Sequence, residues 1–206
     1  MDSQILGGNA KLKGTSLYRR LLAQGLLLQL SCLLCLPFYS LPGNAQLNRE
    51  EDLKAALILS FVRFTEWPSP ATPDTPLVIG VYGQEELLHS LQQLAQGKTV
   101  QGRVIQVRGI RIAADVKQCQ LIHFGSQSGK PVEEHLLVAR EWNVLTVGES
   151  DRFLSSGGVI HVFQQDGRFQ FEVHMGALDK TKLSISSKLL RLGYVVKSAA
   201  GGKGRP

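Results

Sequence analysis

The sequence predicts an α/β fold: a mostly parallel sheet of about six strands with helices on both faces and a C-terminal antiparallel hairpin. Three observations support this prediction. Short apolar runs alternate with longer segments of helical periodicity, which is the pattern of strands joined by helices. The run LVIGVY at residues 77–82 is continuously apolar, as in a strand buried on both faces. The pair Asp166-Gly167 separates two further apolar-rich runs and predicts a tight hairpin turn.

The first element is a helix predicted over residues 50–66. Leu53, Leu57 and Phe61 recur there at helical spacing, and acidic residues at its start suit the positive end of the helix dipole. Trp67-Pro68 ends the helix, because the residue before a proline disfavours the α conformation.

The remaining elements follow from the same periodicities. The proline-rich segment 69–76 is predicted to be a surface loop. Strands are predicted at residues 77–82, 104–107, 120–124, 143–147, 159–163 and 168–173. Further helices are predicted at residues 84–95, 130–141 and 184–196. No internal repeat or linker divides this body, so we expect one domain.

The N-terminus has the organisation of an export signal. Arg19-Arg20 precedes an apolar stretch at residues 21–38, and the small residues Gly43-Asn44-Ala45 follow. We expect residues 1–45 to be a signal peptide cleaved after Ala45, residues 46–197 to be the domain and residues 198–206 to be a disordered tail. An uncleaved membrane anchor or a lipoprotein is the alternative.

Charge and cysteine content exclude several classes of function. Of the net charge of +6, half comes from residues 1–45, and the body lacks the basic stripe of a nucleic-acid binder. Cys119 is the only cysteine after residue 45, so the expected mature chain has no internal disulfide. An exported bacterial chain resides in the periplasm, which lacks ATP and reduced nicotinamide pools, so kinases and dehydrogenases are disfavoured.

The hairpin sorts its side chains onto two faces. A two-residue turn at Asp166-Gly167 places His161 opposite Glu172, with His174 on the same face. The other face is entirely apolar and must pack on the core; it holds Ile160, Val162, Phe169, Phe171 and Val173. The polar face is a candidate ligand or metal patch, although an exposed His–Glu pair of no function is the more common reading.

The other motifs do not indicate catalysis, and turn or helix-cap roles are the alternative for each. The loop from Gly125 to Lys130 is one residue short of a phosphate-binding P-loop, and Gln127 stands where a nucleophile elbow needs serine. Glu149 follows the fourth strand, at the sheet edge where α/β proteins bind ligands. We found no nucleophile–base pair, so we expect a protein that is not an enzyme and has no cofactor, metal or catalytic residues.

The end of the first helix is a candidate interface. Phe61, Arg63, Glu66 and Trp67 combine aromatic and charged residues, which are typical interface anchors. We expect part of this surface to join a dimer or partner interface; the alternative is that the aromatic residues belong to the core.

Four segments in order resemble the YfiR family of secreted bacterial α/β proteins. They are KAALILSFVRFTEWP (54–68), KTVQGRVIQV (98–107), VLTVGESDRFLSSGGVIHVF (144–163) and RFQFEVHMGALDKTKLSISSKLLRLGYVV (168–196). Together they cover essentially the whole mature body, about residues 50–197.

The resemblance implies a periplasmic regulator that binds and represses an inner-membrane diguanylate cyclase, lowering cyclic-di-GMP and limiting biofilm formation. It also implies a homodimer and, for some members, a small-molecule ligand. The alternative is a periplasmic ligand-binding sensory domain. This chain departs from the pattern twice: it lacks the paired cysteines, and His174 replaces the asparagine of the family's "FeIN" strand.

Overall fold

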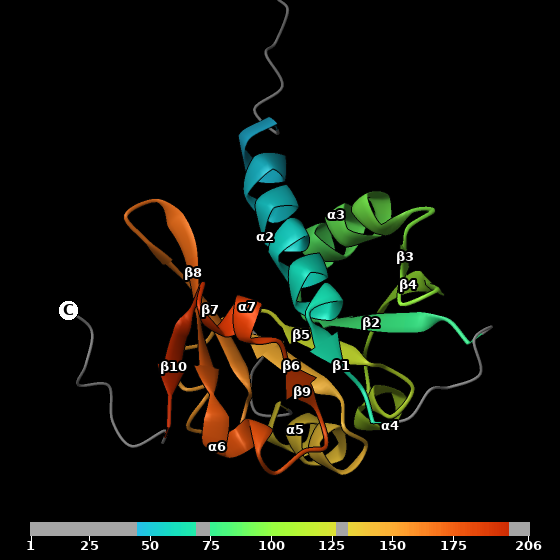
Figure 1. Ribbon diagram of the computed structural model, residues 1–206. Coiled ribbons are helices and arrows are strands. Elements are labelled where there is room, and N and C mark those ends of the chain that lie inside the picture. Colours follow the sequence, from blue (N-terminus) through green and yellow to red (C-terminus); the bar gives the residue numbers. More distant parts are fainter. Residues whose placement is uncertain (1–44, 69–74, 127–131, 198–206) are drawn as a thin grey trace, which may run out of the picture. The chain divides into compact units, whose positions relative to one another are not determined.

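A mixed β-sheet forms the centre of the part of the chain that the structure describes (Figure 1). The computed structural model describes residues 45–68, 75–126 and 132–197, which all fall within one compact unit of the chain. The predicted α/β class is confirmed. The predicted signal peptide, apart from Ala45, and the predicted tail lie outside the described residues.

Within the described residues, the sheet has eight strands in the order β10-β8-β7-β6-β5-β2-β4-β3. Neighbouring strands from β4 to β7 are parallel, whereas β3 pairs antiparallel with β4, and β8 with β7. The strands are β2 (Leu77–Tyr82), β3 (Thr99–Val100), β4 (Arg103–Gly109), β5 (Leu121–Phe124), β6 (Leu145–Gly148), β7 (Ile160–Gln165), β8 (Arg168–His174) and β10 (Tyr194–Val196). The sheet is therefore wider than expected, because β3 and β10 were not predicted.

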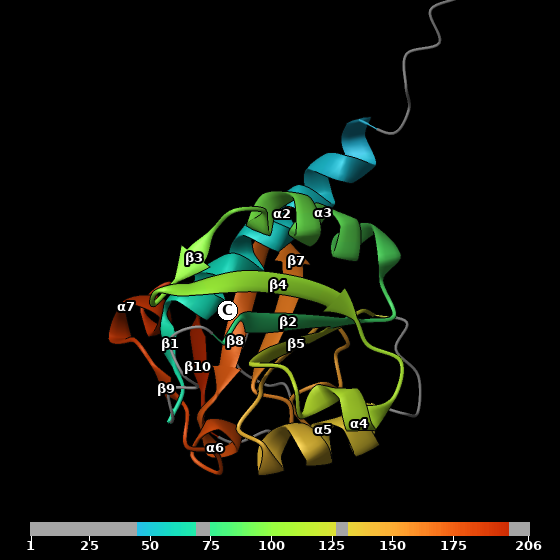
Figure 2. The ribbon, with the colours of Figure 1, turned by 90° about the vertical axis from the view of Figure 1, so that its right-hand side faces the viewer.

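Helices cover both faces of the sheet, as predicted (Figure 2). Helices α2 (Ala45–Arg63) and α3 (Glu85–Ala95) lie on one face, and α4 (Ala113–Val116) and α5 (Val132–Glu141) lie on the other. Each face buries its own apolar cluster, one against α2 and α3 and one against α4 and α5. No described helix combines the length and the apolar character that crossing a membrane requires.

Helix α2 begins earlier and ends earlier than its predicted range of 50–66. It ends at Arg63, and the hydroxyl of Thr65 donates a hydrogen bond to the carbonyl of Phe61 (2.8 Å). Thr65–Glu66 then forms the short strand β1, which pairs antiparallel with β9 (Ser184–Ile185). The last turn of the predicted helix is therefore extended, because its backbone pairs with β9.

The hairpin register follows the prediction. His161 lies opposite Glu172, and Gln165 lies opposite Arg168. Asp166 has a φ of 50°, which suits the tight turn. The predicted apolar face packs into the core under α2, where Phe171 meets Phe61 edge-on with 5.1 Å between ring centroids.

The predicted C-terminal helix over residues 184–196 is wrong. Only Ser187–Leu190 (α7) is helical there, after a short helix α6 (Met175–Leu178). Residues 194–196 instead form β10, a strand parallel to β8.

Close packing at Gly193 explains why the helix stops. A Cβ at this position would overlap the ring of Phe171, so the backbone passes directly against the sheet. Ile185 and Leu189 are buried, but Leu192 is 71% exposed. The helical spacing of these apolar residues therefore did not reflect one buried helical face.

The packing of Phe153 leads to a prediction about stability. Its ring is 2% exposed and fills the space beside Gly148 and Gly158. A methyl group at Gly158 would overlap the ring, so we expect Gly158→Ala to lower the free energy of unfolding by about 1–3 kcal/mol, as overpacked core substitutions do. Urea unfolding followed by circular dichroism measures this change.

Gly109→Ala is the matched control. Its added Cβ would lie 3.4 Å from Leu88, an ordinary contact, so we expect a change within about 1 kcal/mol. Phe153→Leu combined with Gly158→Ala should recover part of the loss. Equal stability of the two single variants would contradict the packing argument.

Candidate functional site

Charged and polar side chains gather where β2, β5 and β6 end at the carboxyl edge of the sheet. We call this group the edge cluster; it consists of Glu51, Lys54, Gln84, His123 and Glu149. From β2 the chain passes through α3 to β4, and then returns through α4 to β5 on the other side of β2. The strand order reverses here, and α/β proteins bind ligands at the carboxyl ends of strands at such a point.

Lys54 lies at the centre of the edge cluster. Its Nζ is 2.9 Å from Oε1 of Glu149 and 3.1 Å from Oε1 of Glu51. It also lies 5.6 Å from the centroid of the Phe169 ring, within the range of a cation–π contact. The side chain is only 5% exposed, so one buried cation joins α2, the end of β6 and the hairpin.

Two further groups complete the network. Nε2 of His123 lies 3.1 Å from the Glu149 carboxylate, and His123 is fully buried. The amide of Gln84, the residue before α3, donates to Glu51 at 3.2 Å. Each carboxylate therefore has two polar neighbours, which offsets part of the cost of burial.

Local structure determines which side chains reach this edge. Lys54 lies on the stripe of α2 that also carries Ala55 and Ile58, so helical spacing turns it toward the sheet. His123 shares a face of β5 with Leu121. Glu149 directly follows β6, as predicted for a residue at the sheet edge.

The ion pair shifts the pKa values of both partners. Burial lowers the pKa of Lys54, but the contacts with Glu149 and Glu51 outweigh burial and raise it above 10.5. Burial raises the pKa of Glu149, but His123 and Lys54 outweigh burial and lower it below 4.5. The network therefore favours the charged forms of both groups at neutral pH.

The pair His161–Glu172 lies on the opposite face of the sheet. Nδ1 of His161 is 2.8 Å from Oε1 of Glu172, and Nε2 is 3.3 Å from the backbone carbonyl of Glu149. Both neighbours are acceptors, so both contacts are hydrogen bonds only when both ring nitrogens carry protons. Glu149 therefore connects the two faces, through its side chain on one and its carbonyl on the other.

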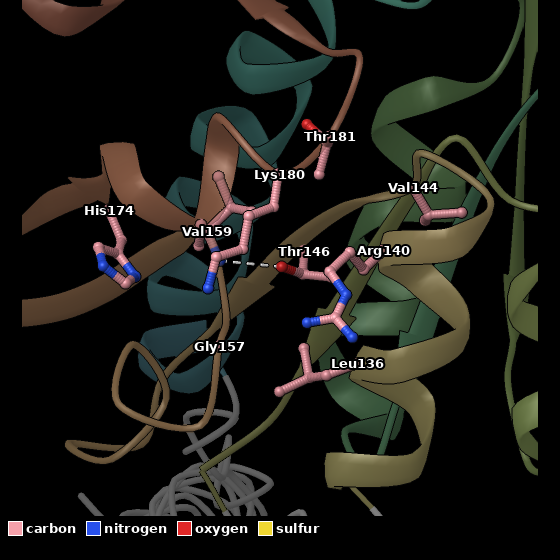
Figure 3. A pocket seen from close by; sticks show the side chains of 10 residues that line it. Leu136, Arg140, Val144, Thr146, Gly157, Val159, His174, Lys180 and Thr181 are labelled. Atoms are coloured by element: carbon pink, nitrogen blue, oxygen red, sulfur yellow. Dashed lines mark hydrogen bonds between the residues drawn. The ribbon is translucent and has the colours of Figure 1, made fainter. Parts of the chain in front are cut away.

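His174 does not join this pair. Within the described residues it has neither a hydrogen bond nor an ion pair with His161 or Glu172, and it lines a small cavity beside α5 instead (Figure 3). No group of three or more histidine, cysteine, aspartate or glutamate residues in the described part of the chain is arranged to hold a metal ion.

The four residues at the end of the first helix have different surroundings. Phe61 is fully buried in the core, so it contributes no contact surface to a partner. Trp67 is half-buried, and its ring N–H donates to the carbonyl of Gln120 (2.9 Å). Arg63 and Glu66 are exposed. The expected interface therefore depends on the two charged residues.

Arg63 borders a groove between α2, α3 and the strands β3 and β4. The groove has a volume of about 510 Å³. Its lining is largely apolar and includes Leu59, Leu94 and Ile105, and Lys98 adds a second cation. None of the described residues that line it is an aspartate or glutamate, so the groove combines an apolar floor with positive charge.

Sequence reasoning found Glu149, His161 and Glu172 but missed Glu51, Lys54, Gln84 and His123. A signal was present for two of them. Lys54 lies four residues before Ile58 on the face of α2 that the structure buries, whereas Leu53 of the predicted stripe is 58% exposed. His123 interrupts the apolar run Leu121-Ile122-His123-Phe124. A polar residue at a core position needs a partner, but the sequence does not say which one.

Comparisons with known proteins agree with the sequence resemblance. Residues 51–194 match the model of the YfiR/HmsC-like family, which covers most of the chain. This chain therefore belongs to the YfiR/HmsC-like family. Membership in this family indicates a periplasmic regulator of cyclic-di-GMP signalling.

Solved structures give more distant likenesses. One is a conserved domain protein from Vibrio cholerae O1 biovar El Tor, with 12% identity, a TM-score of 0.49, and coverage of 71% of this chain and 60% of that chain. Another is the ABC domain in complex with L-Trp from Streptococcus pneumoniae, with 9% identity, a TM-score of 0.44 and the same coverage. This chain thus spans about 60% of each of these structures. No curated protein matches the chain.

The edge cluster leads to a prediction about Lys54. Lys54→Met leaves the carboxylates of Glu51 and Glu149 without their cation, so we expect it to lower the free energy of unfolding by about 3 kcal/mol, as for a broken buried ion pair. The double variant Lys54→Met, Glu149→Gln should be destabilised by less than the sum of the two single variants. We expect the difference in the free energy of unfolding to be at least about 1 kcal/mol, because the partners are coupled. Urea unfolding of the four proteins measures this.

Lys117→Met is the control, because Lys117 is exposed on the other face of the sheet. We expect it to change stability by no more than about 0.5 kcal/mol. Additive effects of Lys54→Met and Glu149→Gln would show that the two groups do not stabilise the fold as a pair.

The pKa of Glu149 also predicts a pH dependence. Folding lowers the pKa of the Glu149 carboxyl group. The stabilisation that Glu149 provides is therefore complete above about pH 4.5 and is lost as the pH falls through its pKa in the folded protein. We therefore expect the stability difference between wild type and Glu149→Gln to shrink as the pH falls from 7 to 3. Glu134→Gln, at an exposed position of α5, is the control and should leave the profile unchanged. A constant difference for Glu149→Gln would contradict the expected linkage.

Proposed function

We propose that this protein binds the periplasmic part of an inner-membrane diguanylate cyclase and represses it, which lowers the production of cyclic-di-GMP. Membership in the YfiR/HmsC-like family over residues 51–194 is the observation that carries the proposal. On this view residues 1–45 direct export, and residues 46–197 form the regulatory domain.

The groove beside α2 is the surface that we assign to the cyclase. It combines an apolar floor with the exposed cations Arg63 and Lys98, neither of which forms an ion pair with another described residue. An acidic and apolar segment of the partner suits such a surface, because opposite charges direct the encounter and the apolar floor excludes water. This assignment retains Arg63 from the sequence analysis, and Glu66 lies three residues further along the chain, in β1.

The edge cluster supports this assignment indirectly. Helix α2 forms one wall of the groove through Leu59 and Arg63, and Lys54 holds the same helix against the sheet. The shape of the groove therefore depends on the ion pair between Lys54 and Glu149.

Charge reversal at the groove tests the proposal. Arg63→Glu with Lys98→Glu should weaken binding to the periplasmic part of the cyclase by at least about tenfold, because two attractive contacts become repulsive. The cyclase is first identified by co-purification from intact membranes, and its periplasmic part is then titrated calorimetrically. Cellular cyclic-di-GMP should rise in a strain that carries the variant.

Arg111→Glu with Lys117→Glu is the matched control, since it makes the same change in net charge at exposed positions outside the groove. It should bind like the wild type. Unchanged binding by the groove variant would move the interface elsewhere, whereas unchanged cyclic-di-GMP after deletion of the whole protein would contradict the repressor function itself.

A further inference from the structure

A second, smaller cavity lies beside α5, on the face of the sheet away from α2 and α3. Its volume is about 50 Å³, enough for a group of a few heavy atoms. Arg140 from the last turn of α5 and His174 from the end of β8 enter it from opposite sides, with Thr146 of β6 between them (Figure 3). Lys180, just after α6, adds another basic side chain.

The charges that line this cavity all have one sign. Arginine, lysine and histidine are present, and no aspartate or glutamate is among the described residues that line the cavity. Neither Arg140 nor Lys180 forms an ion pair with another residue that the structure describes. Two exposed cations therefore lie beside a concave surface without a carboxylate to balance them.

The buried wall of the cavity adds a hydrogen-bond donor. Thr146 is 3% exposed, and its hydroxyl oxygen accepts the backbone N–H of Val159 at 2.9 Å (Figure 3). That bond occupies the oxygen as an acceptor and leaves the hydroxyl proton to donate elsewhere. The site thus offers donors from Thr146, Arg140 and Lys180.

We propose that this cavity binds a phosphate group, either free phosphate or that of a small phosphomonoester, through Arg140, Lys180 and the hydroxyl of Thr146. Guanidinium groups bind phosphate oxygens in a bidentate manner. The two positive charges of Arg140 and Lys180 are balanced by a phosphate dianion, whereas a carboxylate ligand would balance only one of them. The remainder of a phosphomonoester would extend toward solvent between the exposed Arg140 and Lys180. This inference does not depend on the proposed repression of a cyclase.

His174 provides an internal probe of occupancy. Burial lowers its pKa and the nearby charge of Lys180 lowers it further, whereas the backbone of Gly158 raises it. Arg140 and Lys180 are the other charged groups that line the cavity, and both are cationic. A bound phosphate would bring the missing negative charge, so it should raise the pKa of His174.

The test is an NMR titration of the imidazole signals in the purified protein at fixed ionic strength. Inorganic phosphate, glycerol 3-phosphate, acetate and chloride are compared. We expect phosphate or glycerol 3-phosphate to bind saturably and to raise the pKa of His174. The tighter binder of the two shows whether the site takes free phosphate or a phosphomonoester. An unchanged His174, or acetate binding as tightly as phosphate, would overturn the proposal.

Substitution separates the cavity from general charge effects. Arg140→Gln with Lys180→Gln should weaken phosphate binding at least about tenfold, since two charge-assisted contacts are lost. Arg168→Gln with Lys188→Gln removes the same charge at exposed positions outside the cavity and should bind normally. The thermal midpoint of each variant without phosphate verifies folding. Equal affinities of the two double variants would place binding elsewhere and overturn the assignment.

Discussion

The buried ion pair between Lys54 and Glu149 is the interaction on which the arrangement of this protein depends. It joins the first helix to the carboxyl edge of the sheet, and Lys54 also reaches Glu51 and the ring of Phe169. A charge in such a place is costly unless it is paired, so α2 can pack on the sheet only in the position that brings the two charges together. The orientation of α2 in turn forms one wall of the apolar groove.

The hairpin β7–β8 gives the sheet two chemically different faces. Its apolar face completes the core beneath α2, and its polar face carries the pair His161–Glu172. Contacts continue from this pair through the carbonyl and carboxylate of Glu149 to Lys54. A change of charge on the hairpin therefore has a contiguous physical route to the helix that borders the groove.

The edge cluster, the groove and the small cavity lie in different parts of the domain. The edge cluster lies at the reversal of the strand order, the groove lies beside α2 and α3, and the small cavity lies beside α5. Strand β8 connects the small cavity with the pair His161–Glu172. His174, which lines the cavity, and Glu172, which contacts His161, are separated by one residue of this strand.

The sequence by itself determined the fold class, the hairpin register and the position of Glu149 at a strand end, because these depend on local periodicity and turn chemistry. Asp166-Gly167 was enough to place His161 beside Glu172. The family resemblance was likewise carried by short segments, and the match over residues 51–194 confirmed it.

Only the tertiary structure decided the C-terminal segment and the centre of the candidate site. Residues 184–196 have helical spacing, yet pairing with β1 and β8 makes both ends of this segment extended, and Gly193 passes close against Phe171. Lys54 and His123 are far apart in the chain and meet through Glu149, because long-range packing brings α2 over the ends of β5 and β6. Periodicity shows that a residue faces inward; the partner that it meets there depends on which elements the fold places side by side.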